Sequence, residues 1–129
     1  MRIPKLTPVA ASILLTACNE SGGCTAIFAI VQVVAVTPAG DPVLGLTIRD
    51  SLVRTGHAFV VEQWLGAPPG TYQIFNDNYG RELSREVETV RVTGSDGTRG
   101  FSANFVFEAG ECHVAKRSGP DTVIVNTLP

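Results

Sequence analysis

The chain has few charged residues, few cysteines and few histidines, and each scarcity narrows what it can do. Of its 129 residues only 10 are basic and 12 are acidic, which gives a net charge of −2. The sequence has no basic patch that could follow a phosphate backbone, so we expect no nucleic-acid partner. Two histidines and three cysteines leave little material for a catalytic or metal centre. We therefore expect neither an enzyme nor a cofactor.

The N-terminal apolar stretch is too short to span a bilayer, which needs about 20 residues. It covers residues 6–15 and follows the basic side chains of Arg2 and Lys5. A positive start, a short apolar core and small residues before a cleavage site are the layout of a secretory signal. We therefore assign residues 1–17 to a signal peptide, residues 18–23 to a tether and residues 24–129 to one domain.

Residues 15–18 read Leu-Thr-Ala-Cys and resemble the lipobox of bacterial lipoproteins. The resemblance implies that the chain is cut before Cys18, that the Cys18 thiol is diacylated, and that the acyl chains bind a membrane. More than one acyl chain gives durable anchoring, because each buried CH₂ contributes about 0.8 kcal/mol. In Gram-negative members of the family Asn19 would favour the outer membrane, so we expect a location in the bacterial cell envelope. The alternatives are an ordinary signal peptide with an incidental cysteine and a cytosolic protein with an apolar first strand.

Cys24 and Cys112 are the two cysteines that remain if Cys18 carries lipid. Export would place them in an oxidising compartment, where a pair of cysteines normally forms a disulfide. Such a bridge would join the region before the first strand to the penultimate strand. Two free buried thiols are the alternative. A metal site made by Cys112 and His113 is disfavoured, because neighbouring residues on a strand point to opposite faces.

Short β-type patterns fill the remaining chain, separated by Gly, Pro, Asn and Asp turns at 38–42, 67–70 and 94–97. The one helical candidate, residues 79–90, is charged and contains Gly80, so we expect no more than a short turn there. The spacing predicts an all-β fold, a single β-sandwich of about seven to eight strands. The predicted strands cover residues 25–36, 44–48, 59–65, 72–74, 90–92, 101–107, 112–114 and 122–125.

Residues 36–48 (VTPAGDPVLGLTI) and 69–74 (PGTYQI) resemble the carboxypeptidase regulatory-like, or transthyretin-like (prealbumin-like), domain family. The resemblance covers about half of the domain and implies a transthyretin-like or immunoglobulin-like sandwich that serves as an accessory module. Some relatives hydrolyse a purine-breakdown intermediate and carry a Tyr-Arg-Gly-Ser tail. Residues 125–129 read Val-Asn-Thr-Leu-Pro instead, so that activity is not expected.

Three groups of residues are candidate functional sites. A triad of Ser51, His57 and Asp50 is conceivable, but a solvated loop histidine is the simpler interpretation. Residues 76–80 with Glu82 are oxygen-rich like a calcium loop, yet they lack the later bidentate Glu, so a turn is favoured. The remaining candidates are aromatic side chains that could contact a sugar ligand, namely Trp64, Tyr72 and Tyr79.

These observations predict an envelope lipoprotein that acts as a non-catalytic binding or structural module, with another envelope protein or a glycan as partner. The alternatives are a small hydrolase and a glycan-binding lipoprotein. A hydrolase requires a pocket that gathers His57 or His113 with carboxylates. A glycan platform requires Trp64 and a tyrosine exposed side by side. Because the tether is short, the disulfide-closed end should face the membrane, and we expect the partner at the opposite end.

Overall fold

Alternating β-branched and aromatic residues form two sheets in the computed structural model, which describes residues 23–129. The predicted all-β sandwich is confirmed, with nine strands where seven to eight were expected, because the C-terminal segment forms two short strands. The strands are β1 Ile30–Val36, β2 Thr47–Leu52, β3 Ala58–Val61, β4 Thr71–Asn76, β5 Val87–Ser95, β6 Arg99–Ala109, β7 Val114–Ser118, β8 Thr122–Ile124 and β9 Asn126–Thr127. One 3₁₀ helix, η1, covers Asp77–Glu82.

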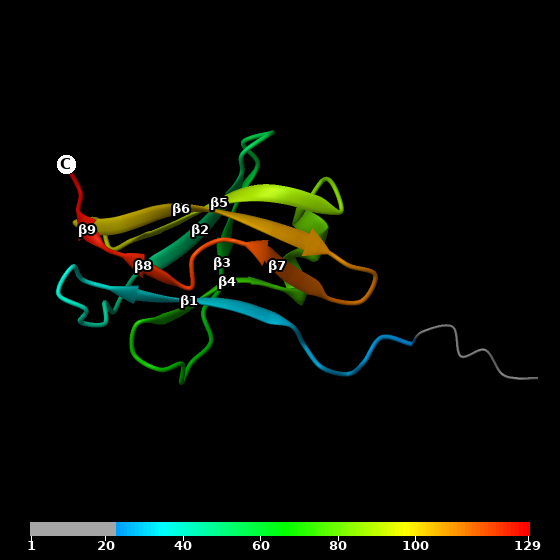
Figure 1. Cartoon of the computed structure of the whole chain (residues 1–129), viewed down its shortest axis with the longest axis horizontal. Coiled ribbons are helices and arrows are strands. Elements are labelled where there is room, and N and C mark those ends of the chain that lie inside the picture. The colour runs from blue at the N-terminus through cyan, green and yellow to red at the C-terminus, as the bar shows by residue number, and fades with distance from the viewer. Residues whose placement is uncertain (1–22) are drawn as a thin grey trace, which may run out of the picture.

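The two sheets differ in size and face each other across the core (Figure 1). The smaller has the order β4-β1-β8, in which β1 is antiparallel to β4 and parallel to β8. The larger has the order β3-β2-β5-β6-β7, and β9 also pairs with β6. The central position of β1 fits its sequence, because a strand flanked on both sides favours a dense run of β-branched residues.

Phenylalanine rings from both sheets fill the space between them. Phe75 of β4 stacks on Phe107 of β6 with ring centroids 4.3 Å apart, and Phe105 lies 5.8 Å from Phe107. All three are fully buried. Such pairs contribute about 0.5–1.5 kcal/mol beyond the burial of their area. The packing therefore joins the small sheet to the large one at its centre.

The interior also contains a completely buried carboxylate side chain, that of Asp50. It lies on the inward face of β2, between Ile48 and Leu52, and is completely buried. Neither carboxylate oxygen has a hydrogen-bond partner within residues 23–129. Burial therefore raises the pKa of Asp50 to about 8. The triad of Ser51, His57 and Asp50, which the sequence analysis disfavours, does not form: Asp50 faces the core without a hydrogen-bond partner, and His57 pairs with Glu82.

Several predicted strands have the wrong boundaries. The first begins at Ile30 and not at 25, and the second covers Thr47–Leu52 where 44–48 was predicted. The third ends at Val61, so residues 62–65 lie in a loop. At the first and third strands the hydrophobic pattern extends beyond the paired residues, whereas β2 stays paired with β5 through Leu52, past the polar Arg49 and Asp50 where the pattern ends. The charged segment 79–90 forms no α-helix: its start completes η1, and its end belongs to β5.

The disulfide between Cys24 and Cys112 is present, with Cα atoms 5.1 Å apart, as the geometry of such a bond requires. Cys112 precedes β7, which begins at Val114, so it is not part of the predicted strand. It lies in the β6–β7 turn, at the end of the sandwich where β1 starts (Figure 1). Cys18 and residues 1–17 fall outside the described residues. Within residues 23–129, no helix reaches the length and hydrophobicity that a membrane crossing requires.

Candidate binding site at the disulfide-closed end

Helix η1 concentrates polar side chains at the end of the sandwich that holds the disulfide. It starts because the Asn76 side chain accepts a hydrogen bond from the Asn78 N–H at 2.9 Å, a capping arrangement typical of asparagine. It ends at Leu83, whose N–H donates to the Gly80 carbonyl. The oxygen-rich segment thus forms a capped turn, as favoured from the sequence, and its Asp77 carboxylate binds protein groups.

A hydroxyl, an imidazole and a carboxylate are connected in series by hydrogen bonds beside the disulfide. Thr25 Oγ1 is 2.9 Å from His113 Nε2, and His113 Nδ1 is 2.7 Å from Asp77 Oδ2. The backbone N–H groups of Ala29 and Val114 also donate to the Asp77 carboxylate, at 2.9 and 2.8 Å. Although burial opposes it, these donors hold the pKa of Asp77 below its ordinary value. The carboxylate therefore joins three chain segments and fixes the His113 ring.

The second histidine pairs with the other end of the same helix. His57, in the turn between β2 and β3, places Nε2 2.7 Å from Glu82 Oε2. Both side chains are partly exposed, at 52% and 29%. Helix η1 therefore holds one histidine at each end, through Asp77 and Glu82. The two histidines thus lie apart, and neither lines the recess beside η1, so the pocket that the sequence analysis requires for a hydrolase is not met there.

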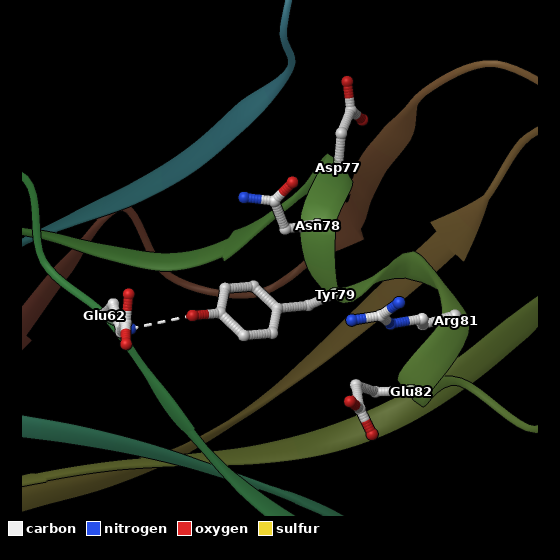
Figure 2. Close-up of a pocket in the computed structure, with 6 residues that line it drawn as sticks. All are labelled: Glu62, Asp77, Asn78, Tyr79, Arg81 and Glu82. Atoms are coloured by element: carbon white, nitrogen blue, oxygen red, sulfur yellow. Dashed lines mark hydrogen bonds between the residues drawn. The ribbon is translucent and has the colours of Figure 1, made fainter.

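A shallow recess of about 490 Å³ lies against η1. Figure 2 shows the side chains of Asn78, Tyr79, Arg81 and Glu82 extending toward one side, where Glu62 approaches from the segment after β3, while Asp77 points away. The Tyr79 hydroxyl accepts the Glu62 N–H at 2.9 Å. The two carboxylates that face the recess, Glu62 and Glu82, outnumber the one guanidinium, Arg81, and such a surface suits a cationic or hydroxyl-rich ligand.

The three predicted ligand-contact aromatics lie at two places: Trp64 and Tyr72 line a depression of about 230 Å³ at the β3–β4 loop, and Tyr79 lines the recess beside η1. Tyr72 is only 7% exposed, and its hydroxyl donates to the Val43 carbonyl at 2.7 Å and accepts the Leu46 N–H at 3.2 Å. It thus has a structural role, and the ligand contact by Tyr72 stays a prediction. Tyr79 lines the recess and stacks on Phe59 with centroids 5.5 Å apart.

Trp64 is half exposed, as a glycan platform requires, but its ring stacks on Phe28 and not on a tyrosine.

The metal alternative at Cys112 and His113 is contradicted, because the Cys112 sulfur is in the disulfide and the His113 ring is hydrogen-bonded to Asp77. No group of three metal-binding side chains occurs in the part of the chain that the structure describes. Comparisons of the chain with protein-family models, with curated proteins and with solved structures found no match.

The two histidine–carboxylate pairs were missed from the sequence, because their partners are 25 and 36 residues apart. The only local signal was the Asn-Asp-Asn run at 76–78, which indicates a cap but not a partner. Chemically, the line of Thr25, His113 and Asp77 has the parts that activate a hydroxyl nucleophile. The nearby amides donate to Asp77, however, where a hydrolase would direct such donors at the substrate oxyanion.

Proposed function

We propose that the chain is a lipid-anchored, non-catalytic binding module of the bacterial cell envelope. The single observation that carries the proposal is the Leu-Thr-Ala-Cys sequence at 15–18, placed after a charged head and a short apolar stretch. Acylation of Cys18 would hold the sandwich on a membrane, and Asn19 favours the outer membrane. The resemblance of residues 36–48 and 69–74 to transthyretin-like accessory modules supports a binding role over a catalytic one.

The disulfide supports an exported destination for the domain. Cys24 and Cys112 join segments that are 88 residues apart. Bridges of this kind persist in oxidising compartments and are rare in the cytosol. The lipobox is a feature of the sequence and the disulfide is a feature of the structure, and both favour the same compartment.

The recess at η1 supports a polar partner, either an envelope protein with a basic surface or a glycan. Its carboxylates remain accessible, because Glu62 is exposed and Glu82 is partly exposed. The recess lies at the disulfide-closed end, and the anchor would place this end toward the membrane. We therefore propose a partner that is itself close to the membrane surface, in contrast to the opposite end expected from the sequence.

Labelling with radioactive palmitate tests the anchor. We expect the full-length chain to incorporate label and Cys18→Ala to lose it. The matched control is the Cys24→Ala, Cys112→Ala double variant, which removes two cysteines but keeps the lipobox and should still be labelled. Equal labelling of wild type and Cys18→Ala would overturn the proposal.

Affinity purification from native envelopes tests the recess. We expect Glu62→Gln with Glu82→Gln to lose most of the partner that wild type retains, because the charges that attract it are gone. The control is Glu86→Gln, an exposed carboxylate that does not line the recess. Equal recovery of the partner with both variants would place the binding surface elsewhere.

The line of Thr25, His113 and Asp77 supports a second candidate function, a small esterase. Hydrolysis of p-nitrophenyl acetate by the folded protein would be measured for wild type, His113→Ala and His57→Ala. An esterase that uses this line would lose its activity with His113→Ala and keep it with His57→Ala. Equal rates in all three proteins would eliminate this candidate.

A further inference from the structure

Two aromatic rings lie stacked on the outside of the domain. Phe28 and Trp64 have ring centroids 5.7 Å apart with planes at 28°. They remain 39% and 50% exposed. Large apolar side chains stand on either side of the pair in sequence: Ile27 is 74% exposed and Leu65 fully exposed. We call these four residues the aromatic patch.

The position of the aromatic patch along the chain places it near the anchor. Phe28 follows Cys24 by four residues, so their Cα atoms are at most about 15 Å apart. The tether from Cys18 to Cys24 spans six residue steps, at most about 23 Å when fully extended. The chain enters the sandwich at this end (Figure 1). If Cys18 is held in a membrane, the patch lies within a short distance of the lipid surface.

The chemistry of the aromatic patch fits a lipid interface. Tryptophan and other aromatic rings concentrate at the boundary between headgroups and acyl chains. Exposed apolar patches on monomeric proteins commonly mark a surface that binds a membrane or another molecule. The neighbouring Glu62 is exposed and the whole chain is mildly acidic, so attraction to anionic lipid does not contribute.

We propose that the aromatic patch inserts into the interface of the membrane that holds the anchor, and so fixes the orientation of the domain. The inference rests on the proposed anchor at Cys18. A single apolar insertion beside the lipidated residue would add a second point of attachment and limit rotation about the tether. The η1 recess would then be held in one fixed direction relative to the membrane surface.

The protein carries its own reporter, because Trp64 is the only tryptophan in the chain. The acylated full-length protein would be reconstituted into phosphatidylethanolamine–phosphatidylcholine vesicles, with and without lipids brominated at acyl carbons 6 and 7. We expect bromine to reduce the Trp64 emission about twofold, because it quenches only within roughly van der Waals contact. Lipids brominated deeper, at carbons 11 and 12, should quench less.

Two variants make the measurement specific. In Trp64→Phe with Leu128→Trp the reporter moves to the C-terminal end, where the Leu128 N–H donates to the Thr98 carbonyl. This protein should float with the vesicles and remain unquenched. In Phe28→Ser the tryptophan is kept but loses its stacking partner, and we expect flotation without change and weaker quenching.

The outcomes separate the inference from the proposed function. Flotation with vesicles and equal Trp64 emission in brominated and ordinary lipid would overturn the insertion and leave the anchor intact. Failure to acquire acyl chains and to float would overturn the anchor, and the insertion with it. Quenching of the Leu128→Trp reporter to the same extent would show contact of the whole domain with lipid and would equally overturn a specific patch.

Discussion

The two ends of the sandwich are closed by different kinds of contact. At the disulfide end the partners are far apart in sequence: 88 residues separate the cysteines, 36 separate His113 from Asp77, and 48 separate Asp77 from Ala29. At the opposite end the two turns are closed by local hydrogen bonds. Gly40 donates its N–H to the Thr37 carbonyl, and Asp96 caps the β5–β6 turn by accepting the Thr98 N–H. The long-range contacts of that end are backbone hydrogen bonds, such as the pairing of β9 with β6. The disulfide end therefore differs in having a covalent bond and side chains that connect distant segments.

This difference predicts that the disulfide end is the more sensitive to substitution. The disulfide restricts the unfolded chain, because it closes a loop of 88 residues, whereas the hydrogen bonds of a local turn impose no such restriction. It also explains where candidate functional groups accumulate. Side chains fixed by distant segments are held in one geometry, and this is a requirement for a binding site. The following experiments test the comparison, from the largest expected effect to the smallest.

Removal of the disulfide should have the largest effect. We expect Cys24→Ala with Cys112→Ala to lower the free energy of unfolding by about 4–5 kcal/mol, because the bridge closes a loop of 88 residues. Guanidinium denaturation followed by Trp64 fluorescence measures it. Wild type in reducing agent should approach the variant, and the variant itself should not respond to reducing agent. A loss below about 1 kcal/mol would contradict the idea that this bridge dominates the stability of its end.

Asp50 belongs to neither end and should give the chain an unusual pH dependence. Below pH 3.8 its carboxyl is protonated in both states; between pH 3.8 and about 8 only the folded state keeps the proton. The free energy of unfolding therefore falls as pH rises through this window, by about 4 kcal/mol between pH 5 and pH 8. The loss is complete above about pH 8.

Denaturant titrations at several pH values would compare wild type with Asp50→Asn, which cannot ionise. We expect the stability advantage of the variant to grow from pH 5 to pH 8. Asp121→Asn removes a carboxylate that is 92% exposed and should keep the wild-type slope. Parallel curves for wild type and Asp50→Asn would show that Asp50 finds a partner in solution.

Asp77 should behave in the opposite sense, because its carboxylate is satisfied. We expect Asp77→Asn to cost about 2 kcal/mol at pH 7, since hydrogen bonds to a charged group are lost. The pKa of Asp77 is lowered by folding, so its contribution is present above its ordinary pKa and disappears as pH falls below it. The cost of the variant should thus shrink in acid. A cost that stays constant down to pH 2 would contradict this assignment.

The same difference between local and long-range contacts decides which features could be predicted from the sequence. The turn at 38–42 was found, because glycine and proline act locally, and the turn predicted at 94–97 lies at 96–98, since Gly94 and Ser95 belong to β5. The all-β class followed from the short alternating segments. The pairs of His57 with Glu82 and His113 with Asp77 could not be found, because no local pattern relates residues brought together only by folding. The burial of Asp50 was equally hidden, since a carboxylate on the inner face of β2 breaks the pattern that the prediction relies on.

The smallest effect should come from the local end. Gly40 has φ of 91° in the turn after β1, and a Cβ there would meet no other atom within 4 Å. Gly40→Ala should therefore cost only the backbone strain, about 1 kcal/mol. Gly23→Ala is the control at the other end: it also lies in open space but without a positive φ, and should leave the midpoint of thermal unfolding unchanged. If Gly40→Ala destabilised the protein as much as Asp77→Asn, the local end would be as constrained as the disulfide end. The contrast in stability between the ends would then be lost, although their contacts would still differ in sequence separation.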